Sequence, residues 1–201
     1  MPNRHLLVAI ATISSVHCFF VRHIPAASGL ARYSVSLSSS ASRPRTHPDF
    51  SGEWEMDMKS SEPLGPVLRE LGVPRLPAAV VARLAVRQSI HQNASHVSIH
   101  VNTVLSRSIL NLLLDGSESL LPGLDGGPTA AVSRWLDDER LETRQLIGDG
   151  NLLDPHSTTF VTTRSLPHRN GSTLLEACTV IRAGVLRASA KRFLLRCITE
   201  E

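Results

Sequence analysis

The sequence is poor in aromatic residues and in cysteine, and its first 48 residues contain no acidic side chain. Phe, Trp and Tyr make up 4% of the 201 residues, so aliphatic side chains must fill most of the core or line most of any cavity. The three cysteines do not settle the redox compartment, because Cys18 lies near the N-terminus and the spacing of Cys178 and Cys197 does not require a disulfide. A hydrophobic content of 42% excludes a wholly disordered chain.

Charge is unevenly distributed along the chain. Residues 1–48 contain five arginines, whereas residues 49–201 contain 16 basic and 18 acidic side chains. The formal net charge of +3 therefore arises from the N-terminal segment, and the remaining chain is slightly acidic. This distribution argues against a nucleic-acid-binding function.

Residues 1–48 have the composition of a targeting segment. A short basic start precedes an apolar run of 16 residues from Leu6 to Val21, which is short for a membrane span and typical of a secretory signal. Residues 22–48 carry four arginines and seven serines, as organelle transit peptides do. With Phe19 near the expected signal cleavage point, the tandem resembles the bipartite presequences of algae with secondary plastids. It predicts a disordered, plastid-directed presequence over 1–48 and one domain over 49–201, with a secreted or a mitochondrial protein as the alternatives.

The domain is expected to begin with a strand followed by two helices. Phe50–Met58 alternates apolar and polar residues, as a half-buried strand does. An apolar stripe with the spacing i, i+3, i+4 and i+7 begins at Leu64, and Ser60 or Ser61 is the expected N-cap of that helix. A second short helix is predicted from Pro77 to Ala85.

After these helices the pattern indicates strands only. Segments of alternating polarity are separated by turn signals, such as Asp115-Gly116, that recur at short intervals. The predicted strands are 86–92, 97–103, 106–114, 117–121, 129–136, 140–147, 157–166, 172–182 and 185–195. The pattern predicts an all-β fold, a ten-stranded antiparallel up-and-down β-barrel with a two-helix lid between strands 1 and 2.

The order of these elements resembles the intracellular fatty-acid-binding proteins, which belong with the lipocalins to the calycin superfamily. The resemblance rests on Phe50-Ser51-Gly52-Glu53-Trp54, on the helix pair ending at Leu71-Gly72-Val73, and on the uninterrupted run of nine strands. It covers about residues 49–196. The helix pair distinguishes the chain from secreted lipocalins, which run from the first strand straight to the second. The resemblance implies a barrel that binds one small hydrophobic ligand and needs no cofactor.

The resemblance also implies where the head group of a ligand would bind. The last strand of the family carries Arg-x-Tyr, whose side chains hold a fatty-acid carboxylate; here Arg192 takes the arginine position and Leu194 replaces the tyrosine. A second family arginine aligns with Thr162, and Arg164 lies one inward step further along; exposed strand arginines are the alternative. A buried Arg192 would need a ligand anion, ordered water or a neighbouring acid. The loss of the tyrosine favours a lipid or isoprenoid with one weakly polar end.

Other interior and structural positions follow from the same comparison. The further candidate ligand contacts are inward positions of the third, seventh and ninth strands: Val97, Ile99, Gln145, Leu175 and Ala177. Gln145 is expected to reach a head group through water. Gly52, Trp54 and Arg196 are expected to close the barrel base, with the guanidinium stacked on the indole.

No group of residues indicates catalysis or a metal site. Ser157 directly follows His156 on a strand, where neighbours face opposite ways, and no nucleophile-elbow or phosphate-binding glycine motif occurs. His91, His96 and His100 straddle a hairpin without a converging cysteine or carboxylate, so solvated histidines are expected there. We expect a protein that is not an enzyme and holds no metal.

The sequence therefore predicts non-covalent binding and transport or buffering of a fatty acid or other small hydrophobic ligand. The alternative is a structural or protein-interaction barrel with a filled interior. A monomer is expected, whose helix pair lids the cavity or transiently contacts a membrane.

Overall fold

The computed structural model describes residues 47–197, apart from residues 124–126, 149, 153, 155, 169 and 170. The predicted presequence lies outside the described residues except for His47 and Pro48, and its targeting function stays a prediction. No helix among the described residues is long and apolar enough to cross a membrane.

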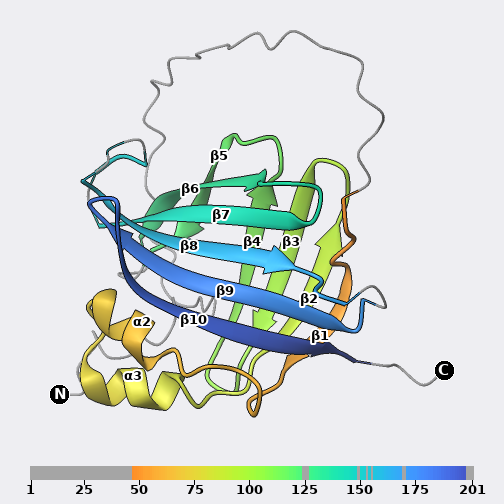
Figure 1. Cartoon of the computed structure of the whole chain (residues 1–201), viewed down its shortest axis with the longest axis horizontal. Coiled ribbons are helices and arrows are strands. Elements are labelled where there is room, and N and C mark those ends of the chain that lie inside the picture. Colours follow the sequence, from red (N-terminus) through yellow and green to blue (C-terminus); the bar gives the residue numbers. More distant parts are fainter. Residues whose placement is uncertain are drawn as a thin grey trace, which may run out of the picture.

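Ten antiparallel strands form one sheet, as predicted (Figure 1). Their bounds are β1 (Gly52–Met56), β2 (Arg87–Gln92), β3 (His96–Asn102), β4 (Arg107–Leu113), β5 (Glu118–Pro122), β6 (Pro128–Trp135), β7 (Arg140–Ile147), β8 (Thr158–Ser165), β9 (Thr173–Arg182) and β10 (Val185–Arg196). The strand order is β4-β3-β2-β1-β10-β9-β8-β7-β6-β5, so the first strand pairs with the last. In the described part of the chain, β4 and β5 stand at the two ends of this order with no ladder between them.

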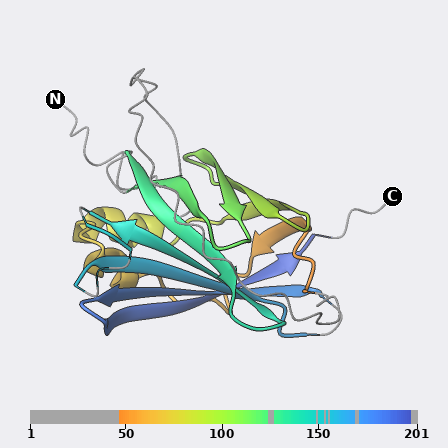
Figure 2. The ribbon, with the colours of Figure 1, turned by 90° about the horizontal axis from the view of Figure 1, so that it is seen from above.

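The sheet folds back on itself to enclose a core. Buried side chains from both halves of the sheet belong to one apolar cluster, which includes Ile99 of β3, Leu112 of β4, Leu141 of β7 and Leu174 of β9. Figure 2 shows the same arrangement from above, with the strands curving around an interior and the two helices at one end. Alternate residues face this interior, most regularly on β4 and β9, as a barrel requires.

The two helices between β1 and β2, α2 (Gly65–Glu70) and α3 (Arg75–Val81), form the lid. The apolar stripe predicted from sequence is buried and packs against inward side chains of β9 and β10 in a second apolar cluster. Gly72 follows α2 with a φ of +85°, a left-handed conformation that glycine adopts at little cost. The lid therefore packs onto the inner surface of the barrel.

The start of the first helix differs from the prediction. The N-cap of α2 is Leu64, without a side-chain capping bond, so the expected cap at Ser60 or Ser61 is wrong. The Ser61 hydroxyl instead accepts a bond from the Phe193 backbone N–H at 3.0 Å, and the Glu62 carboxylate accepts one from the Lys191 N–H at 2.8 Å. Through these two bonds the segment that follows β1 stays attached to β10, and the helix begins only at Gly65.

The hairpin between β9 and β10 contains a β-bulge. Ala183 and Gly184 form its tight turn, both with positive φ, as a two-residue hairpin turn requires. The register then shifts by one residue between Leu186 and Ala188. Because side chains alternate along a strand, this shift decides which residues of β9 lie opposite the inward residues of β10.

The end of the barrel away from the lid contains the aromatic and arginine element expected there. The Trp54 indole N–H donates to the Phe50 carbonyl at 2.9 Å, and the Arg196 guanidinium carbon lies 4.5 Å from the centre of the Trp54 ring. A Cβ on Gly52 would come within 3.0 Å of Arg196 Nη1, so a side chain there would force Arg196 to shift. His47 stacks on Trp135 at 4.1 Å between ring centres, so barrel contacts extend to this residue.

Candidate ligand-binding site

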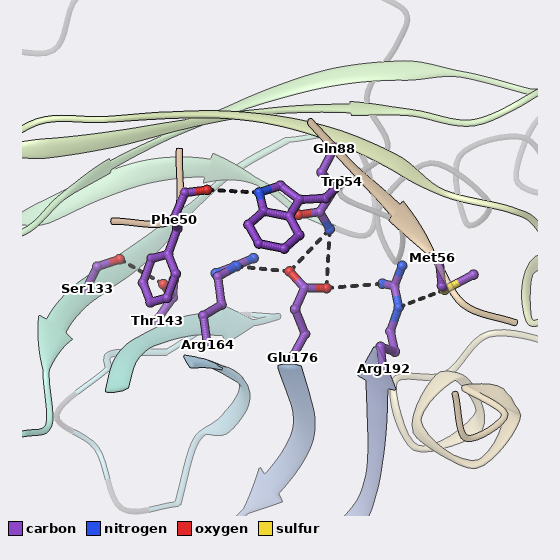
Figure 3. Close-up of polar contacts among 9 residues, drawn as sticks. All are labelled: Phe50, Trp54, Met56, Gln88, Ser133, Thr143, Arg164, Glu176 and Arg192. Atoms are coloured by element: carbon purple, nitrogen blue, oxygen red, sulfur yellow. Dashed lines mark hydrogen bonds and ion pairs between the residues drawn. The ribbon is translucent and has the colours of Figure 1, made fainter. Parts of the chain in front are cut away.

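The barrel interior contains a buried cluster of three charged side chains: Arg164 on β8, Glu176 on β9 and Arg192 on β10 (Figure 3). Each is at most 4% exposed. Arg164 Nε donates to Glu176 Oε1 at 2.9 Å, and Arg192 Nη1 lies 3.7 Å from Glu176 Oε2. Gln88 of β2 reaches across the barrel and places its amide nitrogen 3.2 Å from each oxygen of Glu176. The carboxylate thus has partners from three other strands.

Strand register creates this cluster. Glu176 lies directly opposite Arg164 in the β8–β9 ladder and directly opposite Arg192 in the β9–β10 ladder. Directly opposed residues share a face of the sheet, so the acid necessarily points inward once both arginines do. Three charges in one row across three strands make the centre of the barrel strongly polar.

The cluster keeps Glu176 ionised. Burial alone would raise the pKa of this carboxyl group, but Arg164 and Arg192 together with the Gln88 amide hold it below its ordinary value of 4.5. With both guanidinium groups charged, the cluster carries one net positive charge. One further negative charge would make this buried cluster electrically neutral.

Acid should therefore weaken the fold through Glu176. A carboxyl group whose pKa is lower in the folded state stabilises the protein above its unfolded-state pKa, here near 4.5, and loses this contribution as the pH falls below it. We expect the unfolding temperature to drop more steeply below about pH 4.5 in the wild type than in Arg164→Gln/Glu176→Gln. Exposed aspartates such as Asp57 and Asp137, whose pKa values are also lowered by local hydrogen bonds, affect both proteins alike. Parallel pH curves for the two proteins would contradict the prediction.

Arg192 is the member of the cluster whose hydrogen bonding is incomplete. Its Nε donates to the Met56 sulfur at 3.3 Å, which is a weak acceptor, and its buried Nη2 has no hydrogen-bond partner among the described residues. Arg192 also lines a cavity of about 120 Å³ next to the lid, together with Met56, Leu64, Val81 and Val86. An unpartnered buried donor is costly, so an acceptor at this position would stabilise the site.

The charged cluster separates two apolar regions of the interior. On β10, Leu194 belongs to the cluster of the closed end and Ala190 to the cluster under the lid, with Arg192 between them. On β9, Glu176 lies between Leu174 and Cys178 in the same way. The charged cluster therefore lies at the middle of the barrel, with apolar side chains on both sides.

The structure places most of the predicted site residues inside the barrel. Buried inward positions are occupied by Arg192, Leu194, Arg164, Thr162, Gln145, Val97 and Ile99. The exposed-strand alternative for the two arginines is excluded by their burial.

Leu175 and Ala177 do not line the interior, and the expectation that they do is wrong. The buried residues of β9 are Leu174, Glu176, Cys178 and Val180, and the two predicted residues are only partly buried, on the other face. The physical reason is the bulge in β10, which shifts the partner of Arg192 by one residue.

Gln145 is already engaged in structural bonds. Its amide nitrogen donates to the Pro122 carbonyl at 2.8 Å and to the Thr129 hydroxyl at 2.9 Å, which ties β7 to the β5–β6 hairpin. Ser133 and Thr143 form a further buried polar pair, 3.0 Å apart, on the inward faces of β6 and β7. The polar lining thus continues from the charged cluster toward β6.

Sequence reasoning missed Glu176, Gln88 and Met56. All three contact the two arginines or each other, and Glu176 lies on the face of β9 opposite to the predicted Leu175 and Ala177. The requirement that a buried Arg192 have a neighbouring acid was the one available signal, and Glu176 is that acid.

The remaining reactive side chains are two cysteines, of which Cys178 interacts with Arg192, and the histidines of β2 and β3. Cys178 and Cys197 are both free, and burial raises the pKa of the Cys178 thiol to about 11, so it is protonated at neutral pH. The rings of His91 and His100 lie 5.8 Å apart, and the described residues contain no group of three potential metal ligands.

Comparison with known proteins agrees with this architecture. No protein-family model and no curated protein sequence matches the chain. Among solved structures, the fatty acid transporter REP1-NXSQ is similar with a TM-score of 0.58 and 15% identity over 75% of this chain and 97% of that one. The Caenorhabditis elegans lipid binding protein 8 (TM-score 0.57, 16% identity) aligns with 73% of this chain and 94% of its own. The Schistosoma mansoni fatty acid binding protein in complex with arachidonic acid has a TM-score of 0.56 and 19% identity, and the alignment covers 74% of this chain and 96% of that one.

These similarities define the fold of the chain. It has the same fold as these fatty-acid-binding proteins, with ten antiparallel strands and two short helices between the first two.

Proposed function

We propose that the protein binds a small hydrophobic ligand non-covalently inside the barrel and carries or buffers it, a fatty acid or another lipid with an oxygen-bearing head group. The observation that supports this most directly is Arg192. This buried side chain has an unpartnered Nη2, sits in a cluster with one unbalanced positive charge, and lines a cavity under the lid. A ligand oxygen at Arg192 would satisfy the donor, and the apolar walls would contact the hydrocarbon part.

Ligand entry requires the lid to move. A cavity of about 120 Å³ holds a head group and a few waters, whereas pockets for complete small molecules are typically about 300–1,000 Å³. Side chains of α2 and α3, including Val67, Leu68 and Ala78, occupy the space against Cys178 and Val180. A long hydrocarbon chain must displace these side chains, so we expect binding to loosen the contact between the lid and β9–β10.

Arg192→Ala in the full chain tests the proposed head-group position. We expect the affinity for a fluorescent fatty acid to fall roughly tenfold or more, because a buried charge-assisted hydrogen bond is lost. Fluorescence titration measures this, and Arg187→Ala, at an exposed position on the same strand, is the matched control and should bind as the wild type does. Unchanged affinity in folded Arg192→Ala would reject Arg192 as the head-group residue.

A ligand-free structural barrel is the second candidate function. It is favoured by the close packing of the lid against the interior, where helix and strand side chains form one buried cluster. Native mass spectrometry after mild purification separates the two candidates. A co-purifying lipid supports the carrier, whereas a persistently ligand-free protein that binds no fluorescent fatty acid supports the structural barrel.

A further inference from the structure

Glu176 occupies the position between the two interior arginines. Its Oε1 accepts from Arg164 Nε at 2.9 Å, and its Oε2 faces Arg192 Nη1 at 3.7 Å. The acid belongs to the same row of opposed residues as its partners, so it is held there by the ladders of β8, β9 and β10 and not by a flexible loop. Figure 3 shows the carboxylate between the two guanidinium groups.

A second carboxylate cannot share this position without a large cost. Both oxygens of Glu176 already have partners, since the Gln88 amide lies 3.2 Å from each of them. A ligand carboxylate placed between the arginines would bring two negative charges together among buried side chains, where like charges repel strongly. The resident acid therefore excludes an anionic head group from the space between Arg164 and Arg192.

The remaining place for a head group is on the lid side of Arg192. Here Arg192 Nε donates to the Met56 sulfur, a weak acceptor, and the cavity under the lid begins. Arg164, by contrast, does not line this cavity, and its Nε donates to Glu176. A head group in this position receives hydrogen bonds from one arginine, and that arginine is partly neutralised by the acid next to it.

We propose that Glu176 determines head-group specificity. It acts as an internal counter-carboxylate that fills the anion position between the arginines, confines the ligand head to the lid side of Arg192, and reduces the preference for a carboxylate over an uncharged oxygen head such as an ester or alcohol. The proposal rests on the proposed lipid-binding function and concerns the same site. Glu176 acts through the two arginines and is a positioning residue.

Four proteins and two probes test this proposal. The proteins are the full-length wild type, Glu176→Gln, Arg164→Gln and the double variant Arg164→Gln/Glu176→Gln, and the probes are dodecanoic acid and its methyl ester. Displacement of a fluorescent lipid at neutral pH gives the affinity for each probe, and the ratio of acid affinity to ester affinity is the readout. A general loss of packing changes both affinities together and leaves the ratio unmoved.

The expected order of this ratio follows from the charges. Glu176→Gln leaves two arginines and no acid, so its ratio should rise roughly tenfold or more over the wild type. Arg164→Gln leaves one arginine with its acid and should have the lowest ratio. The double variant has the same net charge as the wild type but no acid beside Arg192, so its ratio should also exceed that of the wild type. This comparison separates the position of Glu176 from the total charge.

The outcomes are distinguishable. Ratios in the double variant and in Glu176→Gln that equal or fall below that of the wild type overturn the proposal, and if Glu176→Gln does not fold, the double variant alone decides. If the wild type binds neither probe, the proposed lipid-binding function fails. In that case, acid binding by the variants that lack Glu176 still supports the role of this residue, and its absence there overturns both proposals.

Discussion

Replacing Glu176 by glutamine should lower the free energy of unfolding by about 3–5 kcal/mol, because it leaves two buried guanidinium groups without an anion. A glutamine can retain a hydrogen bond to Arg164, but it cannot offset the cost of two like charges near each other in the barrel centre. Urea denaturation of the full chain measures this loss. We expect dodecanoic acid to restore part of the stability of this variant, since a ligand that binds only the folded state stabilises it.

Two variants control this result. Glu53→Gln, at an exposed position of β1, removes the same charge from the surface and should change the stability by less than about 0.5 kcal/mol. Arg164→Gln/Glu176→Gln removes one buried positive charge as well, so it should be more stable than Glu176→Gln alone. Such a non-additive effect on stability is expected only of residues that contact each other. A loss below about 1 kcal/mol in Glu176→Gln would mean that water or structural relaxation already screens the two arginines.

Trp54→Ala should cost about 3–5 kcal/mol, the usual range for truncating a fully buried tryptophan. The indole fills the closed end of the barrel, donates to the Phe50 carbonyl, and supports the Arg196 guanidinium on its face. The alanine variant would lose all three contacts and leave a cavity in the larger apolar cluster. Thermal and urea unfolding measure the effect.

Smaller substitutions divide this loss into parts. Trp54→Phe keeps most of the volume but removes the hydrogen bond to Phe50, so it should cost about 1–2 kcal/mol. Trp135→Phe is the matched tryptophan control, because Trp135 is only partly buried and keeps an aromatic ring against His47 and Phe50. Equal losses in Trp54→Ala and Trp135→Phe would show that the closed end does not depend on Trp54.

The fold could be predicted because its determinants are local. Turn residues at short intervals, alternating strands and the apolar stripe from Leu64 each depend on neighbours in the sequence, and all of them agree with one barrel. The start of α2 could not be predicted in this way. Ser61 was available as a cap, but Ser61 and Glu62 bond to backbone groups of β10 about 130 residues away, which no local pattern reveals.

The candidate site was predictable only in part, because the pairing of β9 with β10 is shifted by one residue. Counted from the Ala183-Gly184 turn without a bulge, Arg192 would lie opposite Leu175, in agreement with the expectation that Leu175 and Ala177 face inward. The bulge between Leu186 and Ala188 moves Arg192 opposite Glu176 instead. Both faces of β9 carry apolar residues, so hydrophobic alternation could not reveal the shift.

The bonds that tie residues 57–62 to β10 have a mechanical consequence for the lid. Ser61 and Glu62 are attached to Phe193 and Lys191, the two neighbours of Arg192, and at the other end the Val86 carbonyl accepts a bond from Met56 N–H. Both ends of the lid are therefore fastened to the strands that carry the site. We therefore expect any opening of the lid to be confined to the segment between these bonds, residues 63–85. One end of this segment is bonded to the strand that carries Arg192, so opening of the lid and occupation of Arg192 would act on the same piece of backbone.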